Sequence, residues 1–188
     1  MPAVFNVQEF KAALGNGGAR PNQFMVNIFP PAVLGFPGPE QISILVSSAS
    51  LPSQMIGQAI VHYRGREVKM AGDRTFAPWT TTFVNDTGLI ARQLVEVWMQ
   101  AMESRMLKTG FTNPDMYYGQ LEASQMDRNG GVIRTYTFTD VMPIDISEVP
   151  LDYAANDQVS SFQCTWAYQQ FLIVGGVDDP VGGAIAAV

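Results

Sequence analysis

The stretch Ser161-Phe162-Gln163-Cys164-Thr165-Trp166-Ala167-Tyr168 decides the fold class of this chain. Bulky apolar side chains alternate with small or polar ones, and this period of two predicts a β-strand with one buried face. The second face is polar and uncharged. Such a face suits a strand that packs against another subunit, one that lines a lumen, or one that meets bulk water, and the pattern leaves all three open.

The same alternation recurs in other parts of the chain and predicts a mainly β fold. Further strands are expected over residues 22–29, 41–48, 79–83, 121–125 and 132–139. The first two of these are expected to form a hairpin across a Pro- and Gly-rich loop from Pro30 to Glu40. A second hairpin turn is predicted at Arg128-Asn129-Gly130-Gly131, because Asn-Gly readily adopts the positive φ angles of a tight turn.

An extended hairpin is predicted between Met55 and Met70, with its turn or bulge at Arg64-Gly65-Arg66-Glu67. The alternation is weaker here, and neither face is consistently apolar. A segment of this kind often packs against another chain, although an ordinary exposed hairpin fits the pattern equally well.

One core helix is predicted from Leu89 to Leu107, preceded by N-cap side chains in Asn85-Asp86-Thr87. Its apolar stripe is expected to cover one face of a sheet, and it consists of Ile90, Leu94, Val97, Trp98 and Ala101. A shorter helical run, Val7 to Leu14, precedes a Gly-rich stop.

Together these elements predict an α+β fold dominated by strands, an antiparallel sandwich or barrel with one packed helix and an extended hairpin. We expect three parts: an N-terminal arm over residues 1–18, a β-barrel domain over residues 19–174, and a flexible tail over residues 175–188. A chain of 188 residues is long enough for one such domain and its core.

The composition is apolar and acidic, with 47% hydrophobic residues, 15% charged residues and a formal net charge of −6. Low charge with high apolar content favours a surface that partner subunits cover. Seven acidic residues and no Lys or Arg follow Arg134, which argues against a protein that grips nucleic acid. An acidic surface would let DNA pass without sticking, although a solvated acidic face is the simpler explanation.

We expect no catalytic, cofactor-binding or metal site. His62 is the single histidine and Cys164 the single cysteine, so neither a His/Cys metal cluster nor an internal disulfide is available. Cys164 lies on the apolar face of its strand and is expected to be a small hydrophobe. The sequence lacks a nucleophile elbow and a phosphate-binding loop. It also shows neither a signal peptide nor a membrane-spanning run, so a cytoplasmic origin is expected.

Three segments carry a family resemblance. The first is Ala19-Arg20-Pro21-Asn22 with the strand that follows it. The second and most specific is Ala71-Gly72-Asp73-Arg74-Thr75-Phe76, continued by Trp79-Thr80 and Asn85-Asp86. The third runs from Val141-Met142-Pro143 to Leu151-Asp152-Tyr153. In this order, over about residues 19 to 171, the chain resembles the tail tube proteins of T4-like contractile phages.

The resemblance implies a structural subunit, shared in fold with type VI secretion tube proteins, that forms six-membered rings stacked into the inner tube of a tail. Strands from neighbouring subunits would complete one lumenal barrel, through which DNA passes during ejection without specific binding. The implied partners are further copies of this chain, the tail sheath protein, and baseplate and tail terminator proteins. The family implies no cofactor, small-molecule ligand or direct membrane anchor, and a place in the virion tail after assembly in the host bacterial cytoplasm.

The resemblance also assigns the hairpin from Ile56 to Met70 to the segment that reaches neighbouring subunits or rings. The inter-subunit candidates are Arg64, Arg66, Glu67, Lys69, Asp73 and Arg74. For the family motif a structural role is favoured over a contact role, with Asp73 capping a turn and Trp79 filling the core.

Other functions stay open at this stage. A tube-initiating, capping or baseplate-hub protein of the same fold would form isolated rings. A small-molecule-binding barrel of lipocalin type would be a stable monomer with a wide apolar cavity. An enzyme is the fourth hypothesis, and the sequence offers no residue for it.

Overall fold

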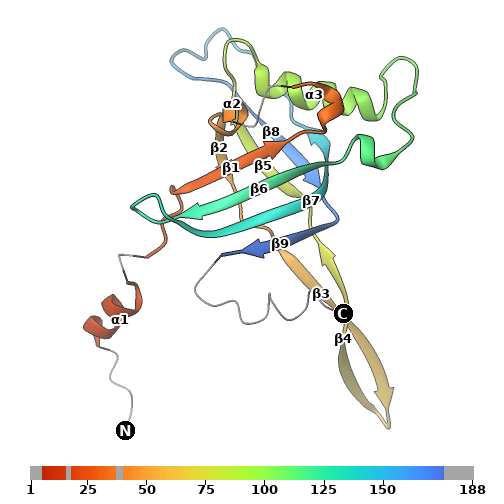
Figure 1. Ribbon diagram of the computed structural model, residues 1–188. Helices are drawn as coiled ribbons and strands as arrows, with labels where there is room; N and C mark the ends of the chain where they lie inside the picture. Colours follow the sequence, from red (N-terminus) through yellow and green to blue (C-terminus); the bar gives the residue numbers. More distant parts are fainter. Residues whose placement is uncertain (1–5, 16–17, 37–39, 176–188) are drawn as a thin grey trace.

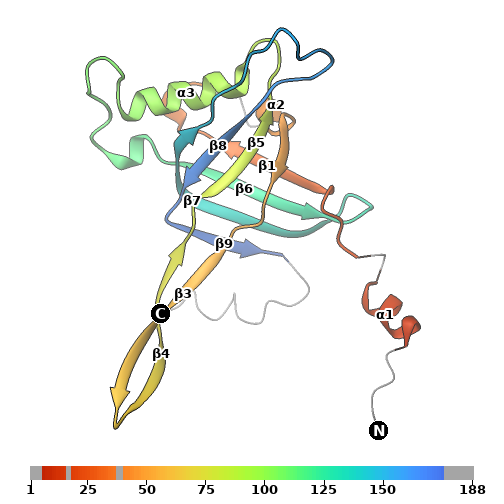
Figure 2. The same ribbon diagram turned by 180° about the vertical axis from the view of Figure 1, so that it is seen from behind.

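The computed structural model describes residues 6–15, 18–36 and 40–175, which form a strand-rich body with a projecting hairpin and an N-terminal helix (Figures 1 and 2). The strands in this part of the chain are β1 Phe24–Phe29, β2 Val46–Ala49, β3 Gln54–Tyr63, β4 Arg66–Phe76, β5 Trp79–Val84, β6 Gly119–Met126, β7 Val132–Ile146, β8 Ser161–Ala167 and β9 Gln170–Val174. The helices are α1 Val7–Ala13, α2 Glu40–Ser43 and α3 Ile90–Met102, with 3-10 turns η1 Ala32–Leu34 and η2 Pro114–Met116.

Two antiparallel layers share the long strand β7. Layer A has the order β1-β6-β7-β9, and layer B has the order β2-β5-β8-β7. The first part of β7 pairs with β6 and β9, and its last residues, Met142–Ile146, pair with β8. The mainly β, antiparallel prediction is confirmed. The sheet is not closed, since β1, β2 and β9 each end it as edge strands.

Strand β7 passes from layer A to layer B at a bulge. Gly119 of β6 pairs with Val141 and Leu121 pairs with Phe138, so β7 carries one extra residue between these pairs. Asp140 lies there with φ 54°, in the left-handed region. The bend interrupts the alternation, which explains why the sequence predicts only residues 132–139 as strand.

The core fills the space between the layers with the predicted alternating residues. Phe162, Cys164 and Trp166 of β8 are buried opposite Phe83, Thr81 and Trp79 of β5. The Trp166 indole Nε1 donates to the Thr81 hydroxyl at 2.8 Å. These bulky residues occupy the volume in which a lipocalin-type barrel would hold a ligand.

Helix α3 closes one end of the core, but it is shorter than predicted. It ends at Met102 instead of Leu107, because the chain folds back on itself there: Ser104 N donates to Thr109 O at 2.8 Å, and Phe111 N to Ala101 O at 3.1 Å. Its buried residues are Ala91, Leu94, Val95 and Trp98. Ile90 and Val97 of the predicted stripe are instead about one-third exposed.

The start of α3 follows the sequence prediction in part, since Asp86 binds its first amide but does not occupy the N-cap position. The N-cap position is held by Leu89, which makes no side-chain cap hydrogen bond, and the Asp86 carboxylate three residues earlier accepts from Gly88 N at 3.2 Å and from Ile90 N at 2.9 Å. Helix α1 also forms where a helix was expected, and the Asn6 side chain caps it. Within the described residues, α1 has no buried side chain.

The predicted hairpin between residues 22–29 and 41–48 is wrong. β1 pairs with β6, whereas β2 pairs with β5, so these segments are edges of different layers. Residues 40–43 form α2 rather than a strand, and this turn buries Ile42 in the core while Ile44 is exposed. Between β1 and β2, the turns η1 and α2 pack against the core through Leu34 and Ile42. Residues 1–5, 16–17, 37–39 and 176–188, including most of the expected tail, lie outside the described residues.

Candidate assembly interface

The hairpin β3–β4 projects from the body, and its outer part is not covered by the described residues of its own chain (Figures 1 and 2). Every residue in its two strands is exposed except Gly57 and Phe76, which are half-buried. An isolated two-stranded ribbon is marginally stable in water. The hairpin is therefore the part of this molecule that gains most from a partner.

The strand register gives the outer hairpin an apolar and a polar face. Directly opposed pairs share a face, and the pairs Ala59↔Met70, Val61↔Val68 and Tyr63↔Arg66 place the apolar side chains together. The pairs Gln58↔Ala71, Ile60↔Lys69 and His62↔Glu67 form the other face. In this outer part the first face is apolar except for Arg66, whereas the second carries Ile60 and Ala71 among polar residues. The prediction that neither face is consistently apolar therefore holds for the whole ribbon, because a bulge in β4 separates the register of the outer part from that of the base.

This bulge lies at two glycines. Ile56 pairs with Arg74 and Gln58 pairs with Ala71, so Gly72 and Asp73 together oppose Gly57. A Cβ on Gly57 would lie 3.2 Å from Asp73 O, and one on Gly72 would lie 3.1 Å from Gly57 O. The backbones thus approach too closely for easy substitution. Asp73 lies in a strand here and does not cap a turn, which corrects the structural role expected for this residue.

The six predicted contact residues all lie on this hairpin and are exposed. Arg64 is in the turn, with its guanidinium 5.4 Å from the centre of the Tyr63 ring. Arg74 Nη1 donates to Gln54 Oε1 at 3.0 Å across the base of the ribbon. In the described part of the chain, the one ion pair joins Arg92 and Glu96 of α3, so the charges of the hairpin have no salt-bridge partner within the described subunit.

A second exposed surface lies at the opposite end of the body, in the loop between β7 and β8 (Figures 1 and 2). This loop, residues 147–160, borders a groove of about 730 Å³. The groove is lined by Val149, Pro150, Leu151, Asp152, Tyr153, Ala155, Gln158, Val159, Ser160 and Ser161. Leu151 is 92% exposed and Tyr153 is fully exposed. Apolar side chains in such a position are typical of a contact surface.

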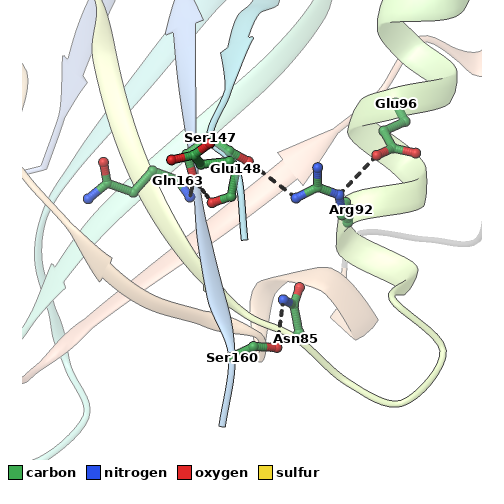
Figure 3. A network of polar contacts seen from close by, with 7 residues as sticks. All are labelled: Asn85, Arg92, Glu96, Ser147, Glu148, Ser160 and Gln163. Carbon is green, nitrogen blue, oxygen red and sulfur yellow. Dashed lines mark hydrogen bonds and ion pairs between the residues drawn. The ribbon is translucent and has the colours of Figure 1, made fainter. Parts of the chain in front are cut away.

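The base of this loop is held by hydrogen bonds from two elements (Figure 3). Arg92 of α3 donates to Ser147 O at 3.2 Å and pairs with Glu96 at 2.9 Å. On the other side, Asn85 Nδ2 donates to Ser160 Oγ at 2.9 Å. Both ends of the loop are thus fixed to the body.

Layer A presents one open face, on the side away from the core. Its members come from alternate positions of the four strands: Met25, Asn27 and Phe29; Gln120, Glu122 and Ser124; Thr135, Thr137 and Thr139; Gln170, Leu172 and Val174. Glu122 is the one charged residue in this set, and most of the others are uncharged polar side chains.

Comparison with known proteins identifies the family. The sequence profile described as "Phage tail tube protein" matches residues 19–174. The chain belongs to this family. It is 28% identical over 167 residues to the tail tube protein of Serratia phage KSP90, covering 87% of this chain and 94% of that protein. It is 27% identical over 150 residues to the tail tube protein gp19 of Enterobacteria phage T4, covering 79% and 88% respectively.

Solved structures share the fold of this tail tube protein at low sequence identity. A chain of the anti-feeding prophage cap aligns with a TM-score of 0.61 and 16% identity, over 84% of this chain and 91% of that one. A chain of the sheath-tube complex of an extracellular contractile injection system aligns with a TM-score of 0.59 and 12% identity, over 88% and 97%. As a member of the family, the protein is a structural component of a phage tail.

The single cysteine and the single histidine of this tail tube protein lie in different environments. Burial raises the pKa of the Cys164 thiol far above its ordinary value, with a smaller contribution from the nearby Asp145 carboxylate. Among the described residues, no group of three His, Cys, Asp or Glu side chains is arranged to hold a metal ion. Within the same residues, the search for helices long and apolar enough to cross a membrane finds none. His62 is exposed on the hairpin.

Three features of the interface were missed from the sequence. The apolar hairpin face depends on the register that the two-residue turn Arg64-Gly65 sets for the outer pairs, the groove depends on how the 147–160 loop folds, and β9 was assigned to no element. The run Phe171-Leu172-Ile173-Val174 was a usable signal for β9, because four β-prone apolar residues precede Gly175.

Proposed function

We propose that this tail tube protein forms six-membered rings that stack into the inner tube of a contractile tail, which conducts DNA into the host cell. The observation that carries the proposal is layer A, a four-stranded sheet with its core side filled by its own chain and its other face open. Such a layer is suited to form one segment of a tube wall.

The open face of layer A would be the lumenal surface. Its Thr, Gln and Asn side chains offer neutral polar contacts, and Glu122 would add one carboxylate per subunit. Phosphates are repelled by carboxylates and bound by Lys and Arg, so a face with this composition favours the passage of DNA. The sequence led us to expect an acidic surface along which DNA passes. Among the described residues, the only acidic side chain on this face of layer A is Glu122, so the lumen would carry one ring of carboxylates.

Edge strands β1 and β9 would join neighbouring subunits around the ring. Each pairs with a partner on one side only within the described structure. An exposed strand edge favours pairing with another chain, and closure into a continuous barrel removes it. Residues 19–174 would form this wall subunit, with residues 1–18 as an arm and residues 175–188 as a tail.

The proposed partners are further copies of this chain, the tail sheath protein, and baseplate and terminator proteins, with no cofactor or membrane anchor. Structures of the same fold occur in assemblies described as a baseplate, a sheath/tube terminator and a sheath-tube complex, which supports this set. The hairpin residues Arg64, Arg66, Glu67, Lys69, Asp73 and Arg74 would contact other subunits. Assembly in the host cytoplasm and a role without catalysis complete the proposal.

Electron microscopy of the purified protein tests this function. We expect long tubes of uniform width with a central channel and six-fold symmetry in cross-section. Isolated rings that never elongate would instead indicate a capping or baseplate-hub protein. A monomer at every concentration, measured by light scattering, would contradict any assembly function.

A further inference from the structure

We propose that the tip of the β3–β4 hairpin docks on the 147–160 loop of a second copy of this chain in the next ring. This inference rests on the proposed tube, and it adds the receiving surface for the hairpin. Three independent observations support this pairing of surfaces: their positions, their charges and their apolar side chains.

The two surfaces lie at opposite ends of the molecule. In both views the hairpin extends from one end of the body and the 147–160 loop caps the other end, beside α3 (Figures 1 and 2). A contact between two different surfaces at opposite ends is head-to-tail, and it repeats without limit when copies are stacked. This is the geometry that an axial contact in a tube requires.

The charges of the two surfaces are opposite. Residues 54–76 contain Arg64, Arg66, Lys69 and Arg74 against Glu67 and Asp73, which gives this hairpin a formal charge of +2. The receiving loop, residues 147–160, contains Glu148, Asp152 and Asp157 and no Lys or Arg, which gives it a formal charge of −3. All of these charged side chains are exposed. Complementary potentials of this kind orient two surfaces and fix their register.

The apolar side chains are also complementary. The hairpin presents Val61, Tyr63 and Val68 on one face close to its tip. The groove beneath the loop offers Leu151, Tyr153 and Val159, each strongly exposed in the isolated subunit. Contact between the two would remove both sets from water, and burial of apolar surface is the main favourable term in association.

The two ends of the receiving loop are held by the body before docking. The contacts of Ser147 with Arg92 and Gln163, and of Ser160 with Asn85, hold both ends of the loop (Figure 3). A surface already held in its bound shape loses less conformational entropy on association. The two ends of the loop therefore have less conformational freedom to lose when the hairpin docks.

A charge-exchange experiment on the full-length protein tests the proposal. One variant carries Arg64→Glu and Arg66→Glu, a second carries Glu148→Lys and Asp152→Lys, and a third combines all four changes. Like charges placed opposite each other suppress association strongly, so we expect each double variant to need a roughly tenfold or higher concentration to form tubes. The combined variant is expected to form tubes again, because the charges are opposite once more.

Two controls separate this contact from general effects of charge and folding. Arg105→Glu with Lys108→Glu makes the same change of charge on the exposed segment after α3, and it is expected to leave tube formation unchanged. Asp152→Asn keeps a side-chain oxygen for its hydrogen bond from Ala154 N, which spans 2.9 Å, and it should weaken tubes less than Asp152→Lys.

The outcomes distinguish this inference from the proposed function. Wild-type tubes establish the function, and double variants that still form rings but not tubes support the axial contact. Tubes from the Glu148→Lys/Asp152→Lys variant at the wild-type concentration would overturn the inference while leaving the function intact. Failure of the four-fold variant to recover, or loss of rings as well as tubes in both double variants, would also overturn it.

Discussion

The sandwich core and the β3–β4 hairpin are built from the same kind of strand and differ in what covers them. Trp166 in the core is completely buried, whereas Tyr63 on the hairpin is 63% exposed. In the core, the second layer and α3 of the same chain cover the apolar face. On the hairpin, the apolar face has no cover within the described subunit. Alternation in a sequence therefore predicts an apolar face, and the fold decides whether the same chain or another copy buries it.

The largest expected effect tests the core side of this comparison. Trp166→Ala should lower the free energy of unfolding of the free subunit by roughly 3–5 kcal/mol. The indole packs 5.6 Å from the Trp98 ring, centre to centre, and its Nε1 binds the Thr81 hydroxyl, which would be left buried without its donor. Urea denaturation below the assembly concentration measures it. A loss below about 1 kcal/mol would show that the core tolerates a cavity here.

A smaller loss of stability is expected for a substitution at the point where the backbone of layer A meets α3. A Cβ on Gly119 would clash with the Trp98 ring and would lie 2.6 Å from Phe29 O. Gly119→Ala should therefore cost roughly 1–3 kcal/mol through overpacking. Gly131→Ala is the matched control, because a Cβ there meets nothing within 4 Å. Equal stability of the two variants, measured by thermal unfolding, would mean that Trp98 and the facing backbone can move aside.

The sequence predicted the core well because its elements obey local rules. β5, β6, β8 and the first half of β7 alternate clearly, the Asn129-Gly130 turn connects β6 to β7, and the Asp86 carboxylate accepts from the first amide of α3. The failures arise where tertiary contacts decide the outcome. β2 pairs with β5 rather than with β1, and the turn of α2 buries Ile42 where alternation predicted a strand.

The candidate interface was predicted in its location and missed in its detail. The family resemblance placed contact residues such as Arg64 and Arg66 on the hairpin, and the structure exposes all six of them. Whether they contact another subunit stays a prediction. The apolar face could not be derived from spacing over the whole hairpin, because the extra residue at Gly72 changes which positions of β4 share a side. The groove depends on the three-dimensional path of the 147–160 loop.

Substitutions of Asp140 at the bend in β7 should have a moderate effect on the stability of the subunit. Asp140 has φ 54° in the middle of this strand, a conformation that costs a β-branched residue about 1–2 kcal/mol and glycine almost nothing. Asp140→Val should therefore destabilise the subunit by about that amount. Asp140→Gly should leave its stability equal or slightly higher. A denaturation series across the three proteins checks this order, and full stability of the Asp140→Val variant would show that the strand relaxes its bend.

The smallest expected effect on stability is that of a substitution on the hairpin. This prediction tests most directly whether the hairpin serves assembly and the core serves folding. Tyr63→Ala should change the free energy of unfolding of the free subunit by less than about 0.5 kcal/mol, as exposed substitutions usually do. The same substitution should reduce tube formation, because Tyr63 is the largest side chain on the apolar face offered to another copy. Met106→Ala is the control, since this apolar side chain after α3 is 91% exposed and belongs to neither docking surface. Denaturation and electron microscopy of one preparation measure the two effects together. A clear loss of subunit stability with normal tubes would reverse the assignment, since the hairpin would then stabilise its own chain rather than join it to the next.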